Sequence, residues 1–375
     1  MPNKIKSFMG SASVIITAMS WIGCSPVRAT SSFYNITNLG NFGYPGSGVT
    51  IANAINKVGQ VVGYSYVTQG PDSYGQAFLY SNGVMSDIGT LGGDLSTANA
   101  INDSGDVVGS ASLSNNGPSH AFLYANGTMS DLGTLGGSVS TAMGINDIGQ
   151  IVGESTISNG AERAFLYSSG IMTDLGTLGG NFSTATGIND AGQIIGWSTT
   201  ASGAYHEFLY NGNKMIDLGS LGGMANASGI NKVGQIVGGS FLSTGANVYD
   251  ATLYTGGSLI DLGRISGANG SSATAINNIG EIVGQLSIIS TNGYDAMLYT
   301  HGQMIDLNTL IPTDSGWTLE GANGINDSGD IVGWGSNGAF LLTPTPEPAA
   351  LTLLALGFAG LGLSRRKNAK RSVAA

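Results

Sequence analysis

The sequence predicts an all-β protein: a seven-bladed β-propeller of four-stranded antiparallel blades, closed by an N-terminal strand completing the last blade. Two observations predict this fold. A unit of about 45 residues is repeated along the chain, and a strand missing from the end of the array is present at its start. The unit is anchored by Ile-Asn with a Gly three residues on, at Asn56, Asn102, Asn146, Asn189, Asn231, Asn277 and Asn326. Fixed periods of 20–50 residues indicate solenoids, propellers or arrays.

Each unit contains four short runs rich in Val, Ile, Phe, Tyr and Thr. In order, they are an A-x-[AG]-I-N run, an apolar run ending in Gly, a run resembling A-F-L-Y, and an [ML]-x-D-[LI] run. Turn dipeptides such as Asn82-Gly83 and Asn126-Gly127 separate the last two, as in β-hairpins. Four strands in about 45 residues is the size of a propeller blade.

The two ends of the array complement each other. The last unit stops after Phe340-Leu341-Leu342 without a D-L run, and residues 35–40 (NITNLG) match residues 172–176 (MTDLG). A ring closed in this way leaves no bare sheet edge. An open solenoid would need caps with a polar outer face, and the sequence shows none. The D-L run is therefore expected as the outermost strand and the A-x-[AG]-I-N run as the innermost.

Residues 1–29 are expected to be a signal peptide, with Lys4 and Lys6 before an apolar run and Val27-Arg28-Ala29 as the cleavage site. The alternatives are a membrane anchor and lipoprotein processing at Cys24. Cys24 is the only cysteine, so cleavage after Ala29 leaves none. That excludes disulfides, a thiolate nucleophile and Cys-ligated zinc in the mature chain.

The array, residues 30–343, carries five basic residues against 22 acidic ones, a net charge of −17, without a basic cluster. Nucleic acid and anionic membrane surfaces are poor partners for such a charge. Only 10% of all residues are charged, and the 61 glycines fall at fixed repeat positions. This composition favours turns in one large all-β domain over disorder.

Residues 344–375 break from the repeat. Pro346, Glu347 and Pro348 lie in a proline spacer, residues 349–363 form a short apolar run, and Arg365 and Arg366 begin a basic end. As a helix this run spans about 22 Å, short of the roughly 30 Å hydrocarbon core, and basic residues after it favour a cytoplasmic C-terminus. An ordinary tail anchor is the alternative.

This tail resembles the PEP-CTERM sorting signal of Gram-negative bacteria. The resemblance implies an exported protein that is transiently anchored in the inner membrane through 349–363 and processed by an exosortase, in an exopolysaccharide-producing or biofilm-forming bacterium. The repeats (HAFLY at 120–124, MSDLGTLGG, INDIGQIVGES) also resemble the HAF family of probable extracellular repeats. That family brings no established activity with it.

Two turns are candidate calcium sites, since they place oxygen ligands at calcium-like spacing. They are N-D-x-G-D at Asn102, Asp103 and Asp106, and at Asn326, Asp327 and Asp330. Lys57 and Lys232 replace the first Asp in sister repeats that must form the same turn, so the fold does not need a metal. Hydrogen bonding of Asn to its own turn explains the pattern without one. No other cofactor is expected.

No catalytic residues are predicted. His120, His206 and His301 have neither the spacing of a zinc site nor a nucleophile beside them. The D-L Asp recurs in six repeats, with Asn38 in the seventh, which indicates a structural hydrogen bond in each blade. Paired carboxylates for glycoside cleavage could still meet across the channel.

The repeats differ most in the connections between strands two and three and between strands four and one. These connections open on one face of a propeller, and they carry aromatic residues. The candidate ligand-binding residues are Tyr44, Tyr66, Tyr74, Tyr205, Tyr249, Tyr294 and Trp317. Exposed aromatics with Asn and Ser suit sugars or a protein surface; the alternative is packing over the blade tops. The sequence thus favours a non-catalytic surface binding or matrix protein whose partner is extracellular polysaccharide or a surface protein. An extracellular polysaccharide hydrolase or lyase is the alternative.

Overall fold

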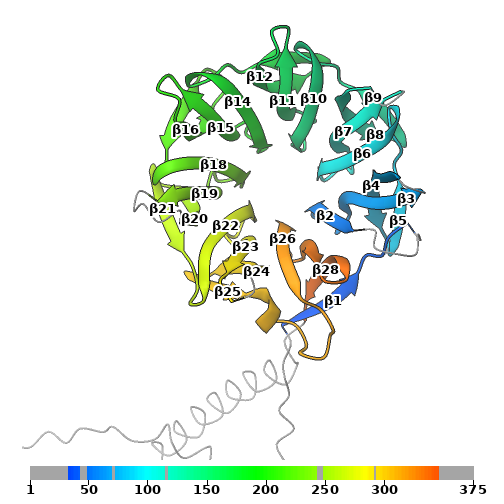
Figure 1. The fold of residues 1–375 in the computed structure, drawn as a ribbon, viewed down its shortest axis with the longest axis vertical. Coiled ribbons are helices and arrows are strands. Elements are labelled where there is room, and N and C mark those ends of the chain that lie inside the picture. Colours follow the sequence, from blue (N-terminus) through cyan, green and yellow to red (C-terminus); the bar gives the residue numbers. More distant parts are fainter. Residues whose placement is uncertain are drawn as a thin grey trace, which may run out of the picture. The chain divides into compact units, whose positions relative to one another are not determined.

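Seven four-stranded antiparallel sheets, the blades, surround a central axis in the part of the chain described by the computed structural model (Figure 1). That part comprises residues 33–42, 49–69, 72–114, 117–242, 248–290 and 293–345. The predicted fold is confirmed. The expected signal peptide and the tail from Pro346 onward, with Arg365 and Arg366, lie outside these residues. Within them, no helix has the length and apolar character needed to span a membrane.

Each strand type occurs once per blade, and the blades are numbered 1 to 7 along the chain. The innermost strands are β2 (Thr50–Ile55), β6 (Gly92–Ile101), β10 (Gly136–Ile145), β14 (Gly179–Ile188), β18 (Gly222–Ile230), β22 (Ala268–Ile276) and β26 (Leu319–Ile325). The second strands are β3 (Val61–Gln69), β7 (Val107–Leu113), β11 (Ile151–Ile157), β15 (Ile194–Thr200), β19 (Ile236–Leu242), β23 (Ile282–Ile288) and β27 (Ile331–Gly335).

The outer half of each blade follows the same order. The third strands are β4 (Asp72–Ser81), β8 (Ser119–Ala125), β12 (Glu162–Ser168), β16 (Tyr205–Tyr210), β20 (Tyr249–Thr255), β24 (Gly293–Thr300) and β28 (Gly338–Pro344). The outermost strands are β5 (Val84–Asp87), β9 (Thr128–Asp131), β13 (Ile171–Asp174), β17 (Met215–Gly219), β21 (Ser258–Gly263), β25 (Gln303–Asp306) and, in blade 7, β1 (Tyr34–Asn38). A 3-10 turn, η1 (Leu307–Thr309), follows β25.

The N-terminal strand completes the last blade, as the sequence predicts. β1 pairs antiparallel with β28, with Tyr34 opposite Pro344 and Asn38 opposite Phe340. Two further backbone bonds extend the contact, from Leu39 N to the Ala339 oxygen at 3.0 Å and from Thr345 N to the Phe33 oxygen at 2.9 Å. Figure 1 shows β1 beside β28 at the closure. The ring therefore closes through a sheet that contains both ends of the array.

At five of the seven interfaces, neighbouring blades pack together through the A-F pair of the third strand. Each buried Phe lies in a core cluster with the Ala of the preceding blade: Phe122 with Ala77, and Phe165 with Ala121. The same arrangement closes the ring, since Phe78 of blade 1 clusters with Ala339 of blade 7. Burying one such aromatic side chain contributes about 1.5–3 kcal/mol. The short repeat motif thus supplies an apolar contact between neighbouring sheets at these interfaces.

The glycine that ends each V-V-G run is required by the closeness of the first strand. A Cβ on Gly109 would lie 1.9 Å from the Thr97 carbonyl oxygen, and one on Gly153 would lie 1.9 Å from that of Thr141. A β-bulge follows at this point of each innermost strand, as between Ala98 and Ala100. Only Gly fits beside the bulge without displacing backbone.

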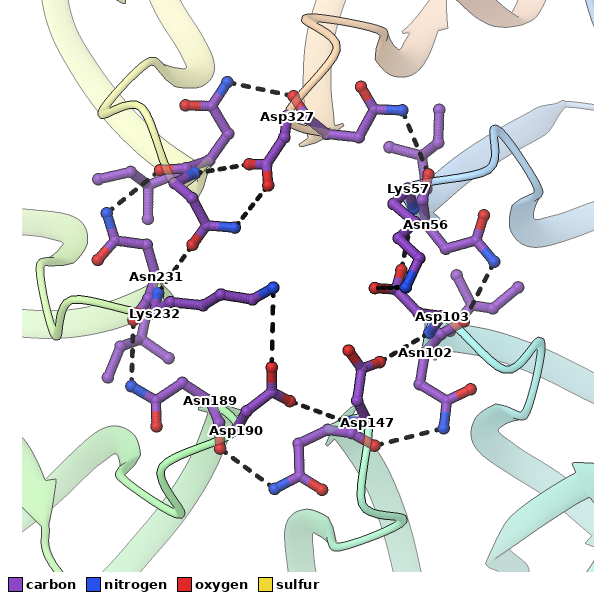
Figure 2. Close-up of a pocket in the computed structure, with 18 of the residues that line it drawn as sticks. Asn56, Lys57, Asn102, Asp103, Asp147, Asn189, Asp190, Asn231, Lys232 and Asp327 are labelled. Carbon is purple, nitrogen blue, oxygen red and sulfur yellow. Dashed lines mark hydrogen bonds and ion pairs between the residues drawn. The ribbon is translucent and has the colours of Figure 1, made fainter.

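The anchor asparagines form a closed ring of hydrogen bonds around the axis (Figure 2). Each Nδ2 donates to the main-chain oxygen of the corresponding Asn in the next blade. The seven distances, starting from Asn56 and ending with the bond from Asn326 back to Asn56, are 3.1, 3.3, 3.1, 3.1, 3.2, 3.1 and 3.2 Å. All seven side chains are buried. The ring therefore links every blade to its neighbour.

The same asparagine also builds its own turn. The Oδ1 of Asn189 accepts from Ala191 N and Gln193 N, and its Nδ2 also donates to Gln193 Oε1 at 2.8 Å. Such side-chain-to-backbone bonds favour a turn. An amide is needed because one end accepts while the other donates. The anchor residue thus satisfies a local turn and a contact between blades together.

Replacing Asn231 with Ala should lower the free energy of unfolding by about 2–4 kcal/mol, because buried backbone groups in two blades lose partners. Asn231 Nδ2 donates to Gln235 Oε1 at 2.8 Å and Asn277 O at 3.2 Å, and its Oδ1 accepts from Gln235 N. Denaturant unfolding measures the change. The control is Val233→Ala in the same turn, where the side chain is 74% exposed. Equal effects of the two substitutions would contradict a role for the ring.

Candidate functional site

The asparagine ring surrounds a cavity of about 220 Å³ at one end of the channel, which is also lined by the Ile before each Asn (Figure 2). The residue after each Asn lines its mouth. In blade order these are Lys57, Asp103, Asp147, Asp190, Lys232, Asn278 and Asp327. The innermost strands and their turns position all seven, since each turn is fixed by the Asn that precedes it.

The mouth residues are tied together by a second set of hydrogen bonds. The main-chain N of one residue donates to the Oδ1 of the next in five of the seven steps, for example Asp103 N to Asp147 Oδ1 at 2.9 Å. In the other two steps the next residue is a lysine, Lys57 or Lys232, which offers no acceptor. Lys57 Nζ lies 2.9 Å from Asp103 Oδ2, and Lys232 Nζ lies 4.0 Å from Asp190 Oδ2.

The pKa values of Lys57 and Asp103 are both shifted. The hydrogen bond to Asp103 raises the pKa of Lys57. Burial alone would raise the pKa of Asp103, but the hydrogen bonds from Lys57, together with Asp147 and the charge of Lys57, outweigh burial and lower it. Both groups are therefore charged at neutral pH. Of the four Asp side chains at the mouth, Asp103 and Asp190 lie beside the two lysines, whereas Asp147 and Asp327 accept from Asp103 N and from Asn278.

The structure separates the two carboxylates of each predicted calcium turn. Asp103 lies at the mouth beside Lys57 of the neighbouring blade, whereas Asp106 Oδ2 accepts from Asn102 Nδ2 at 3.3 Å. In the second turn Asp330 Oδ2 accepts from Asn326 Nδ2 at 3.0 Å, and Asp327 accepts from Asn278. Among the residues with described positions, no cluster of three His, Cys, Asp or Glu could hold a metal ion. Calcium at these turns stays a prediction.

The Asp of the outermost strand has the structural role that the sequence indicates. Its Oδ1 accepts from the main-chain N two residues on, as in Asp131 to Gly133 at 2.8 Å. The same contact recurs in all seven blades, including Asn38 to Gly40. His120 and His206 each lie 2.9 Å from this Asp in their own blade. The histidines therefore extend a turn contact and do not meet one another.

Several predicted aromatic residues lie in strands rather than in loops, because the second and third strands stay paired beyond the expected turn. Tyr66 is in β3, Tyr205 and Tyr249 begin β16 and β20, and Tyr294 is in β24. Trp317 packs edge-on against Phe340 at 6.2 Å and borders the core cluster of blade 7. Tyr44 and the side chain of Tyr74 lie outside the described residues.

These residues fall into two groups. Tyr66 lines a cavity between blades 1 and 2, and Tyr249 and Tyr294 line one between blades 5 and 6. Tyr205 instead lies against Trp197, with ring centroids 5.5 Å apart, and Trp197 stacks on Phe182 at 4.5 Å. Tyr64, which sequence reasoning missed, joins Tyr66. Tyr64 could have been recognised in the sequence as the large aromatic residue that directly follows the V-V-G run of its repeat.

The interface between blades 4 and 5 departs from the other six. Glu207 replaces the core Ala, and Thr252 replaces the Phe that would pack on it. Thr252 Oγ1 donates to Glu207 Oε1 at 3.1 Å. Glu207 is 0% exposed, and its Oε2 has no hydrogen-bonding partner among the described residues. Burial raises the pKa of Glu207 to about 7, against a smaller opposing effect of the Thr252 hydrogen bond.

A second change accompanies this exchange. In blades 2, 3, 4 and 6 a serine accepts from the main-chain N of the preceding blade's core Ala, as Ser140 does from Ala121 at 2.8 Å. Ala225 holds this position in blade 5. Asp250, on the same third strand as Thr252, lies 3.3 Å from Arg264 Nη1 and is 1% exposed. The sequence analysis did not single out Glu207. Its signal was the Glu of HEFLY at residues 206–210, where the other repeats have Ala, together with the Thr of ATLY at residues 251–254 in the next repeat, where most repeats have Phe.

Glu207 should make stability fall as pH rises. Its folded pKa of about 7 exceeds the ordinary value of 4.5, so its contribution is fully present below about pH 4.5 and is lost as pH rises through 7. The loss should be about 3 kcal/mol. Urea unfolding of wild type and Glu207→Gln across this range isolates it, since other groups cancel in the difference. A difference that does not change with pH would contradict the assignment.

The comparison with family models finds the PEP-CTERM protein-sorting motif at residues 344–367. No curated protein matches the chain in sequence. The HAF-repeat resemblance stays a prediction.

Solved propeller structures resemble the chain at low identity. The β-propeller domain of the Trilobed protease from Pyrococcus furiosus is 7% identical, with a TM-score of 0.48, over 82% of this chain and 90% of that one. A catalytically inactive virginiamycin B lyase from Staphylococcus aureus is 13% identical, with a TM-score of 0.46, over 83% and 100%. AofleA from Arthrobotrys oligospora is 12% identical, with a TM-score of 0.43, over 73% and 89%.

Sequence identities this low to the solved structures say nothing of function. The sorting motif, in contrast, bears on where the protein is localised. The chain is a seven-bladed β-propeller with a C-terminal PEP-CTERM protein-sorting motif, which implies processing by an exosortase and export to the cell surface.

Proposed function

We propose that the protein is a non-catalytic binding or matrix protein of the exopolysaccharide layer, exported from a Gram-negative bacterium. The observation that carries this proposal is the contrast between the two faces of the propeller. One face holds the channel mouth and the short turns. The other holds cavities between blades whose described lining consists largely of tyrosines and serines, without a charged side chain.

The channel face offers little free chemistry. Its carboxylates and lysines are engaged with one another or with main-chain N–H groups, for example Lys57 with Asp103 and Asp147 with Asp103 N. General acid–base catalysis needs a titratable group within reach of a substrate. The acid with a near-neutral pKa, Glu207, is fully buried between blades 4 and 5. These positions favour binding over the hydrolase or lyase alternative.

The opposite face has the composition of a recognition surface. Tyrosine supplies a large and rigid amphipathic contact, while Ser and Gly supply hydrogen bonds and space. Cavities of about 420 and 250 Å³ between blades 1 and 2 and between blades 5 and 6 have this lining. The array's net charge of −17 disfavours polyanions and keeps the exported protein soluble.

The exported protein should bind the producing bacterium's purified exopolysaccharide and release no reducing ends from it. Co-sedimentation measures binding, and a reducing-sugar assay on the same mixtures measures turnover. Binding without turnover is the expected result. Absence of binding would contradict the proposal. Release of reducing ends that is lost in Asp147→Asn, a channel-mouth variant, would establish the hydrolase instead.

A further inference from the structure

Two cavities occupy equivalent places in different pairs of blades. Groove A lies between blades 1 and 2 and is lined by Tyr64, Tyr66, Gly75, Thr97, Ser110 and Ser119, among others. Groove B lies between blades 5 and 6 and is lined by Tyr249, Ser272, Gln285, Ser287 and Tyr294, among others. By position in the repeat, Thr97 corresponds to Ser272, and Ser110 to Gln285.

Each groove has a pair of aromatic rings on the lower-numbered blade. In blade 1, Tyr64 and Tyr66 meet edge to face, with ring centroids 5.5 Å apart and planes at 84°. In blade 5, Phe241 and Tyr249 meet at 4.9 Å and 74°. Phe241 is the counterpart of Tyr66 in the repeat. Edge-to-face pairs of this kind hold both rings in place.

The two blades build this aromatic wall from opposite strands. Blade 1 has Tyr64 on the second strand and Gly75 on the third. Blade 5 has Gly239 on the second strand and Tyr249 on the third. A Cβ on Gly239 would lie 2.3 Å from Tyr249 Cε1, so the ring occupies the space that a side chain would fill there. The same wall thus comes from two unrelated residue choices.

Packing alone does not account for the rings of Tyr66 and Tyr294. Core packing at these two interfaces includes Ala77 with Phe122 and Ala251 with Met297. Tyr66, in the wall of groove A, and Tyr294, which faces the wall of groove B, remain 41% and 52% exposed. Opposite the aromatic wall lie the partly buried hydroxyls of Thr97, Ser110 and Ser119 in groove A. Among the residues whose side chains the structure describes, neither groove is lined by Asp, Glu, Lys, Arg or His. The ligand that fits this chemistry is uncharged, with an apolar face and a rim of hydroxyl groups.

We propose that grooves A and B, at equivalent places in two pairs of blades, are two binding sites for a neutral hexose polysaccharide, an inference that rests on the proposed function. The C–H face of a sugar ring lies against Tyr66 of blade 1 in groove A and against Tyr294 of blade 6 in groove B. Its hydroxyl groups bond to the hydroxyls of blade 2 in groove A, and in groove B to Ser272, Gln285 and Ser287, which lie on the same blade as Tyr294. An anionic polysaccharide is disfavoured because the domain is strongly acidic and the described lining of the grooves offers no positive charge.

Two sites on one rigid ring bind a repeating polymer together. Once one groove holds the chain, the second binds at an effective concentration set by the spacing of the sites, so avidity exceeds either affinity. A polymer that reaches both grooves is therefore held more tightly than a short oligomer. This property suits a protein that stays in a matrix without a covalent link to it.

Calorimetric titration of the exported protein with neutral hexaoses (β-1,4-glucan, β-1,3-glucan, α-mannan and β-galactan) tests the proposal, with polygalacturonate as the anionic counterpart. At least one neutral hexaose should bind at two sites per chain. Tyr66→Ala and Tyr294→Ala should each leave one site, and the double variant should leave none. Affinity at an altered site should fall about tenfold or more, the loss of one stacked ring.

The substitution Gly75→Val tests groove A in a second way, by blocking it without removing a tyrosine. A Cβ there meets nothing closer than 3.8 Å, so the blade should fold while the side chain blocks the groove. Tyr66→Phe should keep binding, and Val58→Ala on the channel face, where Val58 is 64% exposed, should change nothing.

The outcomes separate this inference from the proposed function. Exopolysaccharide binding that is unchanged in Tyr66→Ala, Tyr294→Ala and Gly75→Val would overturn the grooves and leave the function standing. Binding of polygalacturonate alone would overturn the neutral-ligand assignment. If neither the exopolysaccharide nor any hexaose binds, both fail.

Discussion

The structure depends on hydrogen bonds that no blade can complete by itself. Each anchor asparagine donates to a main-chain oxygen in the next blade, and the last one donates back to the first. A second series reinforces the first, since Asn53 Nδ2 donates to Ala98 O and Asn323 Nδ2 donates to Ala52 O. An array with a missing blade would leave buried donors without partners, which costs about 1–3 kcal/mol each. Closure is therefore part of the stability of every unit.

The apolar contacts between blades likewise need residues from two neighbouring repeats. Phe of one blade fills the space above Ala of the preceding one, so the two positions belong to one interface although they lie in different repeats. The interface of blades 4 and 5 changes both partners together, with Glu207 and Thr252 meeting through a hydrogen bond. The larger Glu207 and the smaller Thr252 together replace a small Ala and a large Phe, so the volume of the interface is kept, but the exchange buries an acid. This interface thus makes ring stability depend on pH.

The architecture could be predicted from the sequence because it depends on local and countable features. The turn at Asn82-Gly83 has positive φ at both residues, as that dipeptide favours. The closing strand could be inferred by counting, since residues 35–40 match a run that the last repeat lacks. The turn-forming role of the anchor Asn was also readable. Its bond to the next blade was not, because that partner depends on the radius of the ring.

The candidate site was only partly predictable. Tyr66, Tyr249 and Tyr294 were singled out, and the structure places them at two cavities. Tyr64 was missed because it lies in a strand, where an aromatic residue is expected for packing. Tyr205 and Trp317 pack against other aromatic rings. Glu207 was missed because one changed letter in a repeat has no meaning until the facing repeat is placed beside it.

Closure through the first strand can be measured directly with a disulfide. Asn35 and Thr343 are opposite one another in the β1–β28 pair, within the Cα separation that a disulfide spans. In a Cys24→Ser background, Asn35→Cys with Thr343→Cys should oxidise within one chain and raise the unfolding midpoint. Cysteines that stay reduced in the folded protein, or that form only bonds between chains, would contradict a ring closed by its own N-terminal strand.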